Sequence, residues 1–140
     1  MLRIERAPWR EMVEHAEATY PNECVGVLLG ATQDGQKTVQ AALRMENVMP
    51  GSQRERYELD HRQLLAADAE ADRRGLEVIG IYHSHPDCDA YFSATDLKNS
   101  SPWYSFVVLS IRNGRYDHAG SFLPDADQIR ADPEEIILAE

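Results

Sequence analysis

Two histidines separated by one serine, in the sequence His83-Ser84-His85, carry the first chemical signal in this chain. In an extended strand, side chains two residues apart point to the same side, so both imidazoles would face one way and Ser84 the other. A catalytic zinc usually takes three protein ligands and keeps a fourth position for water. Because an isolated His-x-His pair more often marks two partly exposed histidines at a strand end, a third ligand is needed to support a metal site.

Asp96 is the third ligand that we prefer. Ser93 and Asp96 have the Ser-x-x-Asp spacing of a helix N-cap with an acidic residue at its third position, a pattern that is often purely structural. The two interpretations are compatible, because a cap fixes the first turn of the helix. It would hold both side chains on one side of the helix start, where they could face the histidines.

Glu23 is the candidate base. A hydrolytic zinc site needs a group that takes a proton from water and passes it to the leaving group, and a nearby carboxylate can do so. Glu23 follows Pro21 and Asn22 and precedes an apolar segment. A lone glutamate in that position is usually a solvated turn residue, so its assignment depends on the surrounding pattern.

The apolar, β-branched segment 76–82 predicts a buried strand that delivers the two histidines at its carboxyl end, where ligand sites of α/β sheets commonly lie. Periodicity, turn residues and caps predict the other elements. They are helices over 8–20, 60–74 and 93–99, and strands over 25–29, 38–48, 106–111 and 115–122. We therefore expect a single α/β domain over residues 1–140, with a curved mixed sheet flanked by the first two helices.

Composition narrows the class of protein. The 140 residues are 43% hydrophobic and 27% charged, as in a folded globular protein, and carry a formal net charge of −10. The nearest approach to a basic cluster, Arg73-Arg74, lies among acidic residues, which argues against nucleic acid and anionic membranes as partners. Cys24 and Cys88 are too few for a disulfide framework, and no apolar run resembles a signal core or a membrane span. We expect a cytoplasmic protein.

The segment HSHPDCDAYFSATD, residues 83–96, resembles the signature of the JAMM (MPN-plus) zinc metallopeptidases: His-x-His, a seven-residue interval that begins at Pro86, and Ser-x-x-Asp. Upstream, YPNECVGVLLG is similar to the segment that carries the catalytic glutamate of that family. The resemblance runs from about His15 to about Leu109, most of the chain. It implies a JAMM/MPN-like fold, which is cytidine-deaminase-like.

Position by position, the resemblance implies that His83, His85 and Asp96 bind one zinc ion. It also implies that Glu23 is the general acid/base and that the Ser93 hydroxyl helps to stabilise the tetrahedral intermediate. The implied reaction is hydrolysis of an amide or isopeptide bond without a covalent acyl-enzyme.

The loop after the histidines departs from the related bacterial sequences, which often carry prolines there. This chain has Asp89, Tyr91 and Phe92 instead, and we expect the departure to affect substrate choice rather than metal binding. Cys88 in the same loop could approach the metal as an inhibitory thiolate, but a small, partly buried loop residue is the more common role of a free cysteine.

Members of this family act near the C-terminal tails of ubiquitin or ubiquitin-like proteins, and this compact chain resembles bacterial members that process sulfur-carrier proteins. The resemblance implies a small carrier with a Gly-Gly tail as partner, from which cysteine or another short addition is released. The alternatives are a metallopeptidase of broader specificity and a non-catalytic MPN-type interaction module. The module would be expected to have lost ligand residues, whereas all five chemical positions are present here.

Overall fold

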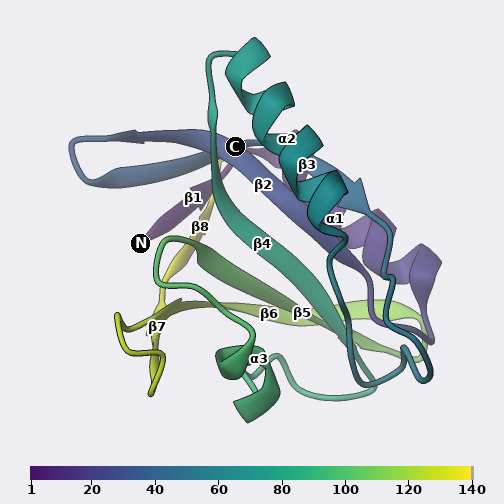
Figure 1. Cartoon of the computed structure of the whole chain (residues 1–140). Helices are drawn as coiled ribbons and strands as arrows, with labels where there is room; N and C mark the ends of the chain where they lie inside the picture. The colour runs from purple at the N-terminus through teal and green to yellow at the C-terminus, as the bar shows by residue number, and fades with distance from the viewer. Residues whose placement is uncertain (140) are drawn as a thin grey trace.

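The computed structural model of the chain describes residues 1–139 (Figure 1). The helices are α1 (Arg6–Thr19), α2 (His61–Arg73) and α3 (Ala94–Lys98). The strands are β1 (Leu2–Ile4), β2 (Val25–Gln33), β3 (Gln36–Met45), β4 (Glu77–Pro86), β5 (Ser105–Arg112), β6 (Arg115–Pro124), β7 (Ala131–Glu134) and β8 (Ile136–Leu138).

All strands join one mixed sheet in the order β7-β6-β5-β4-β2-β3-β1-β8. The parallel pairs are β4 with β5 and β1 with both β3 and β8, and the other neighbours run antiparallel. β4 therefore lies in the interior of the sheet, paired on both sides, as its apolar sequence predicts. The predicted α/β architecture with a curved mixed sheet flanked by helices is confirmed.

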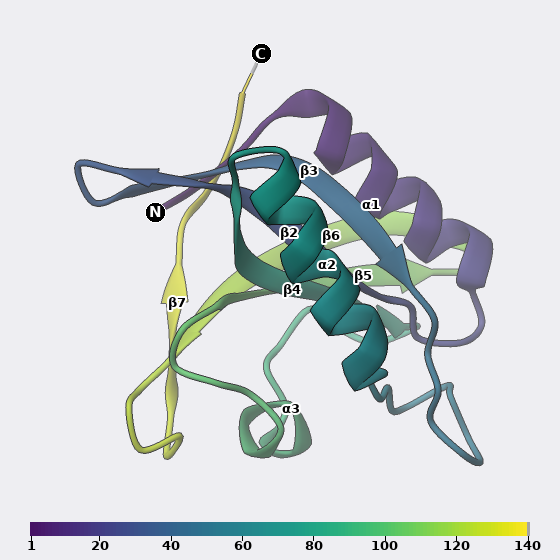
Figure 2. The same ribbon diagram turned by 45° about the horizontal axis from the view of Figure 1, so that its top comes forward.

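The two long helices pack on opposite faces of the sheet (Figure 2). On one face, Met12 and Ala16 of α1 join Leu28 of β2 in the main buried cluster. On the other face, Ala67 of α2 packs with Val27, which precedes Leu28 in the same strand. This alternation follows from the two-residue repeat of a strand and buries both faces of the central strands.

Gly26 permits a close approach across the sheet. A Cβ atom at this position would lie 2.1 Å from the ring of Tyr82 on the neighbouring strand β4. The absence of a side chain therefore makes room for the buried Tyr82 on the α1 face.

The predicted elements are present with shifted ends, and one shift matters for function. β4 continues through Pro86, so both histidines lie within the strand instead of just beyond it. The reason is the pairing with β5, which places His83 opposite Val108 and His85 opposite Ser110. The short strands β1, β7 and β8 were not predicted, since segments of three or four residues show little periodicity.

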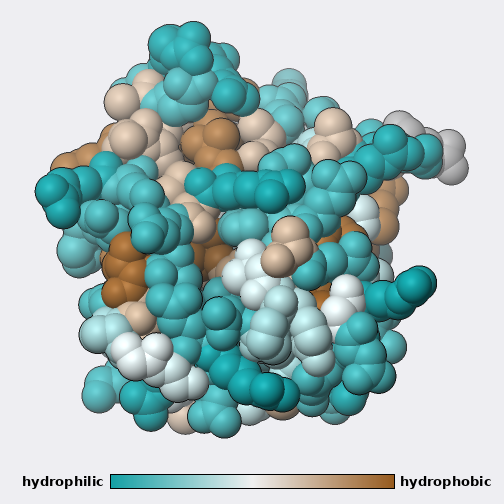
Figure 3. Space-filling model, turned by 90° about the vertical axis from the view of Figure 1, so that its right-hand side faces the viewer, coloured by the Kyte–Doolittle hydropathy of each residue, from teal (hydrophilic) through white to brown (hydrophobic). Residues whose placement is uncertain are grey.

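The surface is mainly hydrophilic. Hydrophilic residues dominate the face drawn in Figure 3, and hydrophobic residues appear there as separate patches. Within the described part of the chain, no helix is long and apolar enough to cross a membrane.

Candidate metal centre

Three buried side chains converge beside β4. His83 Nε2 lies 3.3 Å from His85 Nε2, and each of these atoms lies 3.3 Å from Asp96 Oδ2. The three predicted ligands thus place one donor atom each at the corners of a nearly equilateral triangle. His83 is fully buried, and His85 and Asp96 are each 6% exposed or less.

β4 and α3 bring these residues together. On β4, His83 and His85 face α3, while Ser84 faces the opposite side and accepts a 2.8 Å hydrogen bond from the Cys24 N–H. Asp96 lies in the first turn of α3, where it completes a capping box with Ser93: Asp96 N–H donates to Ser93 Oγ, and Ser93 N–H donates to Asp96 Oδ2. The cap and the approach to the histidines therefore occur together, as the sequence suggested.

The orientation of each imidazole is defined by its neighbours. His85 Nδ1 lies 2.9 Å from the carbonyl oxygen of Asp89, which can only accept, so Nδ1 carries the proton. In the neutral ring Nε2 is then an unprotonated donor atom for a metal, facing His83 and Asp96. The ring of His83 packs against that of Tyr57, with the centroids 4.6 Å apart and the planes tilted by 31°.

The protonation of the group follows from burial and contact. Burial lowers the pKa of His83 and favours its neutral form, against the opposing effect of Asp96. Burial opposes ionisation of Asp96, but its contacts with His83 and His85 outweigh that effect and hold its pKa well below the usual range. Burial also disfavours the charged form of His85, but the interaction with Asp96 raises its pKa. Asp96 is therefore an anion beside two imidazoles.

This donor set fits a zinc ion. Two nitrogens and one carboxylate oxygen are ordinary zinc ligands, and donors about 2.0–2.1 Å from a tetrahedral centre lie about 3.3 Å from one another. The observed spacing matches that value at all three edges. These residues could hold one ion and leave a fourth position facing the cavity described below.

Glu23 lies at the same place although it is far away in sequence. Its side chain is 4% exposed, and its Oε1 atom has no hydrogen-bond partner. Burial, supported by the nearby charge of Asp96, raises the pKa of Glu23 to about 8, against an opposing effect of His85. A carboxyl group with a pKa near neutrality is suited to exchange protons in a hydrolytic reaction.

A cavity of about 490 Å³ opens beside the centre. Glu23, His85 and Ser93 all line it. The Ser93 hydroxyl accepts the helix cap bond through its oxygen, so its hydrogen remains available for a group bound in the cavity. Glu23 and Ser93 thus lie where a substrate would meet the histidines.

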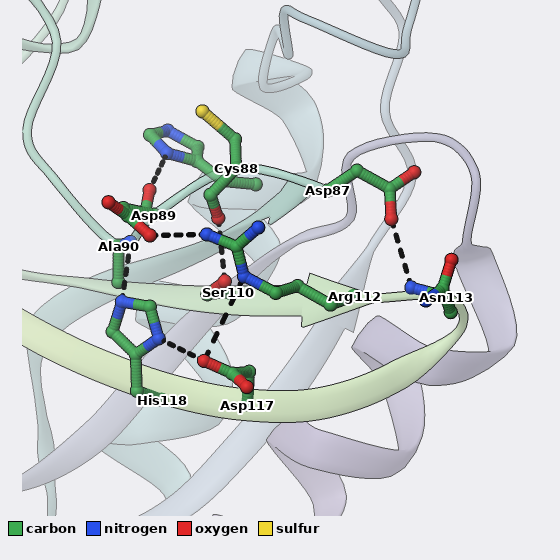
Figure 4. Close-up of polar contacts among 10 residues, drawn as sticks. Asp87, Cys88, Asp89, Ala90, Ser110, Arg112, Asn113, Asp117 and His118 are labelled. Atoms are coloured by element: carbon green, nitrogen blue, oxygen red, sulfur yellow. Dashed lines mark hydrogen bonds and ion pairs between the residues drawn. The ribbon is translucent and has the colours of Figure 1, made fainter.

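The loop after β4 is anchored to the β5–β6 hairpin (Figure 4). Arg112 pairs with the Asp89 side chain, and the Ala90 N–H donates a 3.1 Å hydrogen bond to His118 Nε2. The Ser110 hydroxyl donates to the Cys88 carbonyl at 2.6 Å. These contacts fix the Asp89 carbonyl that orients His85, so ion pairs and hydrogen bonds hold the loop that lacks the family's prolines.

Several residues of the site were not found from the sequence. Among them, Tyr57 packs against His83, and Arg54 and Arg56 line the cavity, yet all three lie in a polar loop without periodicity. No spacing rule connects that loop to the histidines. Cys88, which was considered as an inhibitory thiolate, also lines the cavity and is partly buried, whereas Cys24 is buried in the core.

The mixed sheet presents His-x-His from its central strand, beside the capped Ser-x-x-Asp helix. This arrangement defines a JAB/MPN-type metal domain. Residues 6–121 match the family described as prokaryotic homologs of the JAB domain, and the chain belongs to this family.

Known proteins similar to this chain support the assignment. A desampylase of Haloferax volcanii is 36% identical over 98 residues, which cover 69% of this chain and 68% of that protein. A CysO-cysteine peptidase of Mycobacterium tuberculosis is 35% identical over 108 residues, covering 73% and 68%. The solution structure of a Desulfitobacterium hafniense protein superposes with a TM-score of 0.87 at 30% identity, covering 100% of this chain and 94% of that one.

Proposed function

We propose that this protein is a zinc-dependent peptidase that hydrolyses an amide or isopeptide bond at the C-terminal tail of a small ubiquitin-like sulfur-carrier protein. The observation that carries the proposal is the triangle of donor atoms from His83, His85 and Asp96, with 3.3 Å edges, next to the buried carboxyl of Glu23. Catalytic zinc sites of hydrolases usually have three protein ligands and an open fourth position, and a carboxylate beside them can accept the proton of water.

In this proposal His83, His85 and Asp96 hold the ion, which supplies Lewis acidity that polarises the scissile carbonyl. Glu23 takes the proton from the attacking water and delivers it to the departing nitrogen. Its burial and raised pKa support both halves of that role. Ser93 donates its hydroxyl hydrogen to the carbonyl oxygen as negative charge develops there.

The substrate class is proposed from the relatives together with the shape of the site. Two relatives are named a desampylase and a CysO-cysteine peptidase. A tail that ends in Gly-Gly can lie extended and close to a buried centre, because it has no side chains to exclude. We place the reaction in the cytoplasm, in keeping with the two free cysteines.

The test is hydrolysis of the CysO-cysteine conjugate and of a synthetic peptide ending in Gly-Gly-Ala. The alanine replaces cysteine so that no thiol can bind the metal. We expect the zinc-loaded protein to release the last amino acid from both, and expect chelation to stop the reaction and added zinc to restore it. A zinc-loaded protein that cleaves neither substrate would contradict the proposal and favour the non-catalytic interaction module.

A further inference from the structure

The cavity beside the candidate centre contains two arginines in a chain whose net charge is −10. Arg54 and Arg56 are the only lysine or arginine residues that line it. They come from the loop between β3 and α2, while the candidate centre comes mainly from β4 and α3. Cationic side chains of one loop and the hydrolytic residues of other elements therefore line the same cavity.

The two arginines differ in how far they are already neutralised. Arg54 pairs with Asp87 at 3.3 Å, and Asp87 also accepts hydrogen bonds from the Tyr20 hydroxyl and the Asn113 N–H. Within residues 1–139, Arg56 forms no ion pair and its side chain makes no hydrogen bond. Arg56 is thus the guanidinium in this cavity that is available to an anionic ligand.

A guanidinium binds a carboxylate through paired N–H donors, and its charge persists at all physiological pH values. A substrate carries a carboxylate near the scissile bond only when the group released is a single C-terminal amino acid. Its carboxyl carbon is then two bonds from the departing nitrogen. An isopeptide-linked lysine has no free carboxylate at this position.

We propose that Arg56, assisted by Arg54, binds the free carboxylate of the amino acid released from the carrier tail, an inference that rests on the proposed function. The enzyme then acts as a carboxypeptidase toward the carrier. Water adds to the glycine carbonyl carbon, the C–N bond breaks, and the nitrogen leaves as the amine of a free amino acid.

The remaining charges of the cavity agree with such a product. Glu23 and Glu55 line the same cavity as Arg56. A released amino acid is a zwitterion, with an ammonium group and a carboxylate close together, and so matches a cavity that carries both carboxyl and guanidinium groups. A lysine released from an isopeptide bond would present an ammonium group alone, leaving Arg56 without a counterion.

The experiment compares two forms of the peptide ending in Gly-Gly-Ala, one with a free C-terminal carboxylate and one with a C-terminal amide. For the zinc-loaded parent we expect kcat/KM to be about 10- to 100-fold higher for the free acid, the value of a charged hydrogen bond. Arg56→Gln should remove most of the preference for the free acid, because kcat/KM for the free acid should fall much more than kcat/KM for the amide, which presents no carboxylate. Arg54→Gln should have a smaller effect, because Arg54 is already paired with Asp87.

Arg62→Gln is the matched control, since Arg62 lies on α2 with its side chain 92% exposed and does not line the cavity. Binding of both peptides to the zinc-loaded Glu23→Gln protein gives a measurement that needs no turnover. Equal binding and equal cleavage of the acid and the amide, or a preference that Arg56→Gln leaves intact, would overturn the inference while the proposed function stands. Cleavage of neither peptide would overturn both.

Discussion

On the α1 face of β4, the hydroxyl of Tyr82 forms a 2.7 Å hydrogen bond with His15 Nδ1, and Ser84 accepts one from the Cys24 N–H. On the opposite face, Glu23 Oε1 and His83 Nδ1 are equally buried but have no hydrogen-bond partner. Both faces therefore contain buried histidines, and among residues 1–139 the unpaired atoms of Glu23 and His83 lie on the face toward α3.

An unpaired buried polar atom lowers the free energy of unfolding by about 1–3 kcal/mol, so each such atom in a folded protein calls for an explanation, such as a functional role. Because His15 and His83 are both buried but have different surroundings, burial alone does not indicate the role of a histidine. His15 is a satisfied core residue, with its partner supplied by the tyrosine that Gly26 accommodates. The α3 face collects the donor atoms of His83, His85 and Asp96 toward one point, and the Glu23 carboxyl lines the cavity beside them.

The largest expected effect concerns Glu23. Glu23→Gln should reduce turnover by about 10²- to 10⁴-fold, because the amide cannot accept the proton of water. The free energy of unfolding of the metal-free protein should not fall and should rise at pH 7. Glutamine stays neutral, whereas the Glu23 carboxyl is ionised in the unfolded chain and must take up a proton on folding, where burial raises its pKa to about 8.

Tyr82→Phe is the matched change on the other face and should give the reverse result. It leaves His15 Nδ1 buried without a partner, so we expect a loss of about 1–3 kcal/mol of stability with turnover retained. Urea unfolding and steady-state kinetics on both variants check the contrast. A large loss of turnover in Tyr82→Phe would remove the distinction between the faces.

The second prediction concerns pH and the α1 face. Burial, and to a lesser extent the charge of Arg44, lowers the pKa of His15 from its ordinary value of about 6.5 to about 4. Between pH 4 and 6.5, His15 therefore binds a proton in the unfolded chain but stays neutral in the folded chain. The contribution of His15 to stability is therefore complete above pH 6.5. It is lost as the pH falls toward 4, by at most about 3 kcal/mol.

His15→Gln removes this titration and preserves a side chain that can hydrogen bond to Tyr82. Urea unfolding at pH 4.5 and pH 7 should show a smaller decrease of stability in the variant than in the parent. An identical decrease in the two proteins would mean that His15 is not the buried neutral histidine described here.

The smallest effect concerns the loop that orients His85. Arg112→Gln breaks the exposed ion pair with Asp89, so stability should change by less than about 1 kcal/mol. Zinc affinity should fall by less than about tenfold, because the Asp89 carbonyl that fixes the His85 ring becomes less well held. Arg130→Gln, which removes the exposed pair with Asp132, serves as the control and should leave zinc affinity unchanged.

The sequence predicts the α3 face better than the rest of the site. The two-residue spacing of His83 and His85 and the cap spacing of Ser93 and Asp96 are local rules, and each describes one element correctly. Glu23 required the family pattern, because its closeness to the histidines depends on β2 pairing with β4, which no local spacing encodes.

Features that arise from long-range contacts were not predictable in this way. Tyr57 and Arg56 reach the site from an irregular loop. Strand β1 forms by pairing with β3, and β8 forms by pairing with β1. A three-residue strand has too few side chains to show a pattern, so its position is determined by the neighbours it bonds to.

The most direct test of the central claim is the zinc content of the parent, Glu23→Gln and Asp96→Ala after saturation with zinc and removal of excess metal. We expect about one zinc ion per chain for the parent and for Glu23→Gln, and little for Asp96→Ala. Asp96 supplies one of the three ligands, whereas Glu23 supplies none. Equal zinc in Asp96→Ala and the parent, or no zinc in the parent, would contradict zinc binding by His83, His85 and Asp96.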